Sequence, residues 1–137
     1  MKKVIFLLGS LIMLAACGEP PKQALPETII THRDLDSEVN KTVAKMTIGG
    51  MMCADGCGGK IQQDLRALPG VVSTELEFEE NRAENVVKVE FDPTITDEKK
   101  LIECVQSIAD GKYPVSSVEV LHYHGLLNKG VTGGDAV

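Results

Sequence analysis

Alternating apolar and polar positions predict four β-strands in the middle of the chain. In the first of them Ala44, Met46 and Ile48 fall on one side and polar residues intervene, which is typical of a half-buried strand. Glu75 and Glu77 give the second strand an acidic outer side, so we expect a sheet with one face open to water. The alternating segments are residues 42–48, 72–79, 87–91 and 115–121.

Two other segments repeat apolar residues every three or four positions and predict amphipathic helices. Pro69-Gly70 would end the first helix and Gly111 the second. Thr96 or Asp97 can cap the start of the second helix. The apolar stripes are Ile61, Leu65 and Leu68 in the first helix, and Leu101, Val105 and Ile108 in the second.

The order strand, helix, strand, strand, helix, strand predicts an α+β fold. It is the ferredoxin-like βαββαβ sandwich, a four-stranded antiparallel sheet with two helices on one face. Right-handed crossovers place the first and third strands at the centre. The loop 111–114 would then lie beside the loop that follows the first strand, while His122 and His124 would lie at the opposite edge, roughly 20 Å away at ~3.3 Å per residue.

The first residues have the form of a bacterial export signal. Met1-Lys2-Lys3 is followed by the apolar run 4–16, which is too short to span a bilayer as a helix. Leu14-Ala15-Ala16-Cys17 resembles the lipobox, so residues 1–16 are predicted to be removed and Cys17 to be lipidated. The alternative is an ordinary signal peptide that happens to end at a cysteine. Gly18 follows Cys17 where an aspartate would favour retention at the inner membrane, so the outer membrane is slightly favoured.

The remaining chain divides into a tether, a domain and a tail. Residues 17–40 contain three prolines and no apolar period, which indicates a flexible tether in which His32 is solvated. Residues 41–122 form the domain, and the glycine-rich residues 123–137 are expected to be a disordered tail. Loss of Lys2 and Lys3 with the leader leaves 12 basic and 20 acidic side chains, a net charge of −8. That balance argues against binding of nucleic acid and is compatible with cations or a basic partner.

The glycine-rich segment 49–60 holds the chemistry of the chain. Cys53 and Cys57 lie four positions apart in a loop that leads into the first helix, so their sulfurs can converge. A helix start favours the thiolate form of cysteine, and two thiolates beside Met51 and Met52 make a soft site suited to Cu(I). Asp55 is the only acid within the loop, and no local histidine completes a tetrahedral zinc set.

Three plainer interpretations apply to the other chemically active residues. Cys53 and Cys57 can form a disulfide, although so short a loop constrains the unfolded chain little. Cys104 falls near the apolar stripe of the second helix and is expected to be a small core residue. His122 and His124 are expected to be a polar strand end, with a weak second metal site as the alternative.

Residues from about 41 to 120 resemble the heavy-metal-associated domain. The family signature Gly-Met-x-Cys-x-x-Cys is recognisable in Gly50-Met51-Met52-Cys53 and Cys57. The family includes copper chaperones, N-terminal domains of copper-transporting ATPases and periplasmic mercury-binding proteins. Further matches are Ile61, Leu68-Pro69-Gly70-Val71, Val89-x-Phe91-Asp92 and Tyr113.

The resemblance implies roles for several residues. Cys53 and Cys57 would be the metal ligands, and Met51 a buried prop under the loop. Tyr113, or Lys112 beside it, would cover the site and offset its negative charge. Met52 occupies the variable position of the motif and would be a weak thioether ligand of the metal. This chain has one more residue between its cysteines than the family pattern, which Gly56 can absorb and which displaces Cys53.

These observations predict a lipid-anchored metal-binding protein of the cell envelope that sequesters or transfers a thiophilic ion. Cu(I) is favoured, with Hg(II) or Zn(II) as alternatives, and a metal-transporting ATPase or an efflux protein is the implied partner. Mercuric-ion scavenging is a second hypothesis, supported by Tyr113-Pro114 and Ser116-Ser117. A thiol–disulfide redox module is an alternative of another class, and an adhesin-like structural domain is a further one. No triad, carboxylate pair or phosphate loop is present, so we do not expect an enzyme.

Overall fold

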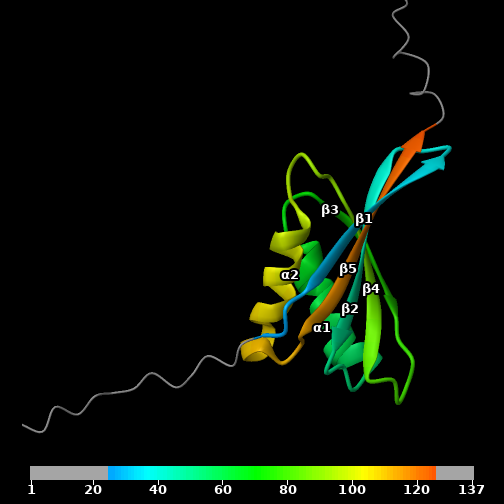
Figure 1. Ribbon diagram of the computed structural model, residues 1–137. Coiled ribbons are helices and arrows are strands. Elements are labelled where there is room, and N and C mark those ends of the chain that lie inside the picture. The colour runs from blue at the N-terminus through cyan, green and yellow to red at the C-terminus, as the bar shows by residue number, and fades with distance from the viewer. Residues whose placement is uncertain (1–24, 126–137) are drawn as a thin grey trace, which may run out of the picture.

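A five-stranded sheet with two helices on one face forms the part of the chain that the computed structural model describes, residues 25–125. Figure 1 shows α1 and α2 side by side against this sheet. The strands are β1 (Ile29–Ser37), β2 (Lys41–Gly49), β3 (Val71–Glu77), β4 (Glu84–Phe91) and β5 (Val115–Gly125). The helices are α1 (Gly59–Arg66) and α2 (Glu98–Ser107). A short turn, η1 (Ala54–Gly58), leads into α1, and another, η2 (Ile108–Gly111), follows α2.

The predicted βαββαβ arrangement is present from β2 to β5. The sheet order is β1-β5-β2-β4-β3, so β2 and β4 are the inner strands of the predicted four, as right-handed crossovers require. All pairings among these four strands are antiparallel. Asp97 caps α2, since its carboxylate accepts a hydrogen bond of 2.9 Å from the backbone N–H of Lys100. The α+β class and the two helices on one face are confirmed.

The prediction of a four-stranded antiparallel sheet is wrong, because β1 adds a fifth strand. β1 pairs in parallel with β5, in a register that runs from Ile29 opposite Ser117 to Ser37 opposite Gly125. Arg33 bridges the two strands, with its Nη1 2.9 Å from Oε1 of Glu119. Residues 29–37 are therefore part of the domain rather than of a flexible tether. The exposed and charged side chains of β1 are typical of an edge strand, which explains why no apolar period marked it.

The domain also extends further at its C-terminal end than the boundary at residue 122. β5 continues through Tyr123 and His124 to Gly125, whose backbone N–H donates a 2.7 Å hydrogen bond to Oδ1 of Asn40. Residues 123–125 are thus strand and not tail. The proposed leader 1–16, Cys17 and the rest of the proposed tail lie outside the described residues.

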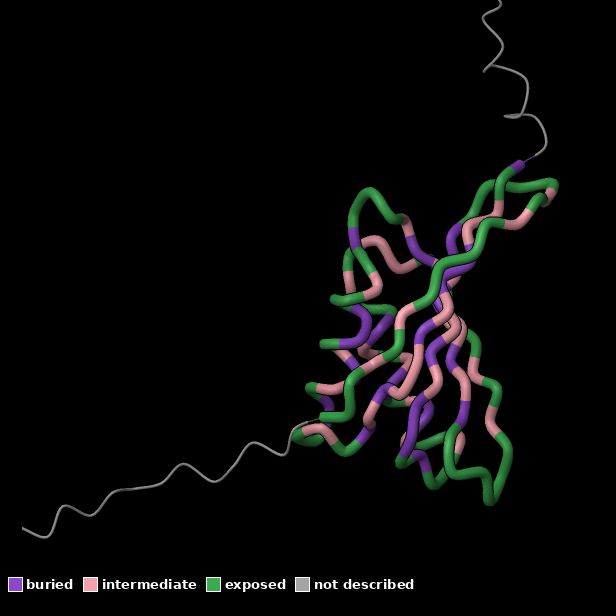
Figure 2. Tube along the Cα trace, viewed as in Figure 1, coloured by how far each residue is buried: buried purple, intermediate pink, exposed green. Residues whose placement is uncertain are grey.

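The core lies between the sheet and the two helices, where Figure 2 shows the buried positions along the inner strands. Leu65 from α1 and Leu101 from α2 are fully buried against it. Within residues 25–125 no helix has the length and apolar character needed to cross a membrane. The fully buried apolar residues of the strands are Ala44, Met46, Ile48, Val87, Val89, Val115 and Val118.

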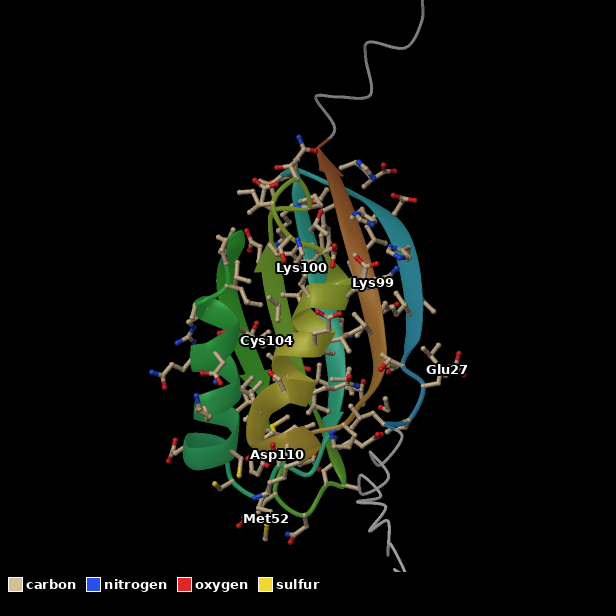
Figure 3. The ribbon with its side chains drawn as sticks, turned by 90° about the vertical axis from the view of Figure 1, so that its left-hand side faces the viewer. Glu27, Met52, Lys99, Lys100, Cys104 and Asp110 are labelled. Atoms are coloured by element: carbon tan, nitrogen blue, oxygen red, sulfur yellow. The ribbon has the colours of Figure 1, made fainter. Side chains whose placement is uncertain are left out.

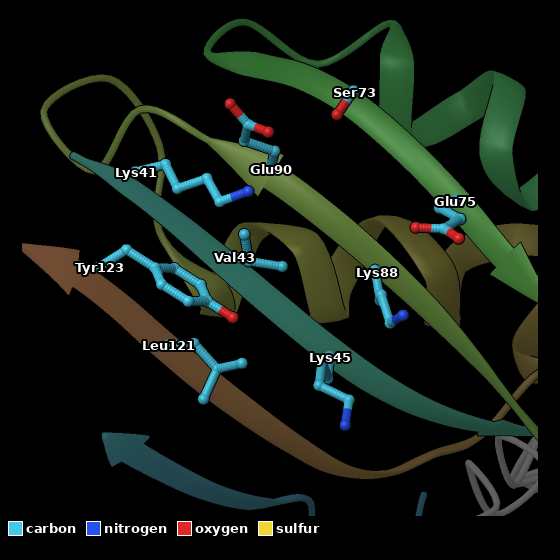
Figure 4. Close-up of a pocket in the computed structure, with 9 residues that line it drawn as sticks. All are labelled: Lys41, Val43, Lys45, Ser73, Glu75, Lys88, Glu90, Leu121 and Tyr123. Atoms are coloured by element: carbon cyan, nitrogen blue, oxygen red, sulfur yellow. The ribbon is translucent and has the colours of Figure 1, made fainter. Parts of the chain in front are cut away.

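The other face of the sheet is open, as the alternating pattern predicted. Figure 4 shows lysine and glutamate side chains interleaved there around a shallow hollow of about 390 Å³. Lys88 forms an ion pair with Glu77, so the acidic side chains of β3 are partly neutralised by β4. No residue of the cysteine loop lines this hollow, which makes it a solvated sheet face rather than a part of the candidate site.

Candidate metal centre

The cysteine loop is held against the segment that precedes β5. The backbone N–H of Gly49 donates a 2.9 Å hydrogen bond to the carbonyl of Pro114. Gly50 has a φ of 78°, and a Cβ at that position would collide with the carbonyl oxygen of Lys112. The cysteine loop therefore packs closely on residues 112–114. This agrees with the sequence analysis, which expected the segment before the last strand, β5, to lie beside the cysteine loop.

The additional residue between the cysteines is taken up by a turn of π-helix. Residues 54–58 form η1, and the backbone N–H of Gly58 donates to the carbonyl of Cys53 over 3.2 Å, five positions back. Such one-turn π segments accommodate an inserted residue at the end of an α-helix. Gly58 is buried, and a Cβ there would collide with the side chain of Leu76. The start of α1 is thus fixed, and the insertion affects only the segment that carries Cys53.

The two sulfurs lie together at the surface. Sγ of Cys53 is 3.7 Å from Sγ of Cys57, and the backbone N–H of Cys57 donates to Sγ of Cys53 over 3.4 Å. Cys53 is exposed and Cys57 is half-buried, and neither is in a disulfide. A Cβ at Gly56 would lie 3.0 Å from Sγ of Cys53, so glycine keeps the approach to this sulfur open. The arrangement is an accessible dithiol.

The buried Tyr113 lowers the pKa of Cys57. Its buried side chain hydrogen-bonds to Cys57, and this contact, helped by the backbone of Met52 and the thiol of Cys53, lowers the pKa of Cys57 to about 7. The same bond to Cys57, followed by desolvation, raises the pKa of Tyr113 to about 12, so its hydroxyl remains a donor. Nζ of Lys112 lies 5.8 Å from the centre of the Tyr113 ring and adds positive charge nearby. Cys57 is thereby poised as a thiolate near neutral pH.

The methionines of the motif have different environments. Met51 is buried in the core with 5% of its surface exposed, whereas Met52 is 81% exposed. Figure 3 shows Met52 at the tip of the domain, at the same end as Asp110 of η2. The role of Met51 as a prop and that of Met52 as a thioether ligand stay predictions, because burial alone tests neither.

The remaining predicted sites are separate from the dithiol. Cys104 is half-buried against the core, and desolvation, with the charge of Asp64, raises its pKa, as suits a structural cysteine. His122 is opposite Thr42, whereas Val115 is opposite Ile48, so the histidines lie at the far end of β5 from the cysteine loop. His32, interpreted from sequence as solvated, is exposed and in addition contacts His122. The run Ile29-Ile30-Thr31 before it has the β-branched composition of a strand and was the available signal.

The sulfur separation bears on which ions the dithiol can hold. Two thiolates on a tetrahedral ion with bonds near 2.3 Å are about 3.8 Å apart, and on a linear ion with similar bonds about 4.6 Å. The observed 3.7 Å is therefore that of a bent pair. No three histidine, cysteine, aspartate or glutamate side chains among residues 25–125 are already grouped around one point. A bound ion would have these two thiolates as its protein ligands, with an open position for an exchanging partner.

We predict that Tyr113→Phe makes Cys57 less reactive at neutral pH. The variant keeps the buried ring but loses the hydrogen bond that stabilises the thiolate, so the pKa of Cys57 should rise above about 7 and its alkylation by iodoacetamide should move to higher pH. At pH 7 the rate should fall by about threefold or more. Mass spectrometry of the Cys57 peptide in the reduced, metal-free chain measures this, with Cys104 as the internal reference. An unchanged pH profile would show that Tyr113 does not control Cys57.

The fold and this site define an α+β domain that presents a surface dithiol on a π-helical turn. No protein-family model matches the chain, and no curated protein matches it. Among solved structures, a similar one is the crystal structure of a copper binding domain from HMA7, a P-type ATPase, with 18% identity and a TM-score of 0.37. The match covers 58% of this chain and 92% of that chain. Similarity at this level does not establish a function, which we therefore infer from the site.

Proposed function

We propose that this protein binds a thiophilic metal ion through Cys53 and Cys57 and sequesters it or passes it to a partner. The observation that carries the proposal is the pair of surface sulfurs 3.7 Å apart, one of them with a pKa lowered to about 7. Thiolates are the form that binds metal, so the site is ready for a soft ion without a large change in protonation. Binding rather than catalysis is the proposed role.

Cu(I) is the favoured ion, and Hg(II) and Zn(II) are the alternatives. Soft sulfur ligands select Cu(I) over hard cations, and in the described part of the chain, residues 25–125, no group of three carboxylates that could hold Mg²⁺ or Ca²⁺ adjoins the loop. The exposed Cys53 suits stepwise exchange, since a partner's ligand can reach the ion while Cys57 still holds it. The resemblance of Gly50-Met51-Met52-Cys53 to the heavy-metal-associated motif extends the proposal to a metal-transporting ATPase or an efflux protein as the partner.

Lipidation of Cys17 would place the dithiol close to a membrane of the cell envelope. Leu25 is the first described residue, and its Cδ2 is 3.2 Å from the position of a Cβ at Gly111, next to Lys112 and Tyr113. The eight residue steps from Cys17 to Leu25 span about 29 Å at most. With β1 part of the domain, the lipid anchor would thus hold the cysteine end within reach of a membrane-embedded partner.

Metal binding is tested by titrating the reduced full chain, purified in detergent, against a chromogenic Cu(I) chelator. We expect one Cu(I) per chain, with copper–sulfur scattering and no copper–imidazole scattering in X-ray absorption. Competition with Hg(II), Zn(II) and Cd(II) then orders the preferences. A chain that leaves all Cu(I) on the chelator, or that binds it through imidazole, would contradict the proposal.

The proposed anchor predicts a processed and acylated N-terminus. Mass spectrometry of the protein extracted from membranes should find residues 1–16 absent and acyl chains on Cys17. Cys17→Ala should block this modification and move the protein out of the membrane fraction. An intact leader, or an unmodified Cys17 in the soluble fraction of cells that express the native chain, would exclude lipid anchoring without affecting the metal proposal.

Thiol–disulfide exchange is a second candidate because the same observations favour it. The thiolate of Cys57, with a pKa of about 7, can attack a substrate disulfide and release one substrate thiol. The sulfur of Cys53, 3.7 Å away, can then attack the mixed disulfide, which releases the second substrate thiol and leaves a Cys53–Cys57 disulfide. The reduction potential of the Cys53–Cys57 pair separates the two functions when it is measured beside the Cu(I) titration. Turnover of substrate disulfides by a chain that binds no metal would favour the redox module.

A further inference from the structure

Three histidines and an aspartate from two distant parts of the chain gather at the end of the sheet opposite the cysteines. The parallel register sets Asp34 of β1 opposite His122 of β5, and two-residue steps along each strand place His32 and His124 on the same face. Val118 and Val120 lie on that face too and are buried, so the cluster continues the helix side of the sheet beyond the core. Figure 3 shows β1 and β5 side by side near the start of α2.

The two closest imidazoles meet through their nitrogens. Nδ1 of His32 is 3.3 Å from Nε2 of His122, while the ring centres are 5.6 Å apart and the ring planes differ by 6°. The nitrogens therefore lie between the rings, which meet edge to edge rather than face to face. Two nitrogens on a tetrahedral ion with bonds of 2.0–2.1 Å are about 3.3 Å apart. The 3.3 Å separation is that of a hydrogen bond between the rings, and two nitrogens bound to one such ion have the same separation.

The outer nitrogen of each ring is close to a second group. Nδ1 of His122 is 3.5 Å from the hydroxyl of the buried Thr42, and Nε2 of His32 is 3.9 Å from Oε1 of Glu98 on α2. A hydrogen bond to the outer nitrogen orients a metal-binding imidazole, and Thr42 is at the distance to make one with His122. The inner nitrogens, Nδ1 of His32 and Nε2 of His122, face each other between the two rings.

A carboxylate completes the set. Oδ1 of Asp34 accepts a 2.8 Å hydrogen bond from Nε2 of His124. The parallel register sets Asp34 directly opposite His122, so its carboxylate lies beside His122 as well as His124. A hollow of about 490 Å³, lined in part by Thr42, His122 and His124, opens beside the cluster. Ions in solution can therefore reach it.

We propose that His32, His122 and Asp34 form a second metal site, for a divalent ion of the kind that prefers imidazole, such as Zn(II). Imidazole and carboxylate ligands suit Zn(II), Ni(II) and Cu(II), in contrast to the soft dithiol at the other end. His32 and Asp34 are exposed, so rotation of their side chains can bring them around one ion, which they do not yet surround. The ion would join edge strand β1 to β5, and the site does not depend on the function proposed for Cys53 and Cys57.

The test uses the full chain with Cys53→Ser and Cys57→Ser, so that the dithiol cannot contribute. Zn(II) competition against a colorimetric chelator should show one bound ion, and His32→Ala or His122→Ala should weaken it by at least about tenfold. Asp34→Asn should also weaken it. Its matched control is Glu75→Gln, which removes the same charge from the open face of the sheet, on β3 and away from β1, and should have no effect.

Nitrogen-15 NMR of the imidazole rings adds a readout that a purely structural role would not change. Zn(II) should shift Nδ1 of His32 and Nε2 of His122, and it should raise the melting temperature only while both rings are present. His32 is an exposed edge-strand residue, so His32→Ala decides the matter even where His122→Ala impairs folding. Zn(II) binding that survives both substitutions, or rings that do not respond to it, would overturn the proposal.

Discussion

Replacing both Cys53 and Cys57 with serine is expected to abolish Cu(I) binding. The two sulfurs are the soft ligands of the loop, and serine offers only a neutral hydroxyl that a soft ion disfavours. Loss of both should weaken binding by at least about a thousandfold, or roughly 4 kcal/mol. The Cu(I) chelator competition on the reduced full chain measures the change directly.

The same double variant should keep its fold, because the sulfurs lie outside the core. Cys53 is exposed and Cys57 half-buried, so circular dichroism and the melting temperature should change little. Cys104→Ser is the matched control. Cys104 packs against the core, so its serine variant should lose about 1 kcal/mol of stability and still bind Cu(I). Retained Cu(I) binding in the double variant, or its loss in Cys104→Ser, would mean that the site has been misplaced.

The parts of the fold that the sequence predicted are those with a strong burial pattern. β2 and β4 bury every second side chain, and α1 buries Ile61 and Leu65 one turn apart, so alternation and helical spacing were legible. Asp97 and the Pro69-Gly70 turn marked element ends through local chemistry, which does not depend on distant contacts. These features are properties of short segments.

β1 was missed because its stability comes from a partner ninety residues away. Of its nine residues six are exposed, and Ile30, Leu35 and Ser37 are only half-buried, so no apolar face appears in the sequence. Pairing with β5 and the Arg33–Glu119 ion pair hold it in place instead. For the same reason the sequence did not show that His32 lies next to His122, which was assigned to a polar strand end.

At the candidate metal centre the cysteines and their neighbours in sequence were predictable, and the geometry was not. The motif located Cys53 and Cys57, and the predicted strand order placed the loop before β5 beside them. The sequence also showed that one additional residue had to fall between the cysteines, near Gly56. It did not show that the residue enters a π-helical turn, because that choice depends on the close packing of Gly58 on Leu76 and of Gly50 on Lys112.

Deleting Gly56 is expected to raise the preference for Cu(I) over Zn(II) by at least about tenfold. The deletion leaves one residue fewer between the sulfurs and should convert η1 into an α-helical turn, since α1 stays in register. A linear ion needs sulfurs on opposite sides, whereas a tetrahedral ion accepts the bent 3.7 Å pair of the π turn. Removing the π-helical turn should therefore weaken the binding of Zn(II) more than the binding of Cu(I).

The ratio of the Zn(II) and Cu(I) dissociation constants measures this effect in parallel chelator competitions. Gly56→Ala is the control of unchanged length. Its Cβ would lie 3.0 Å from Sγ of Cys53 and crowd the sulfur, so it should weaken both ions without changing their ratio. Because selectivity is a difference between two affinities, a general loss of binding does not imitate it. If the deletion variant folds and its ratio stays constant or falls, the π turn does not set the metal preference of this site.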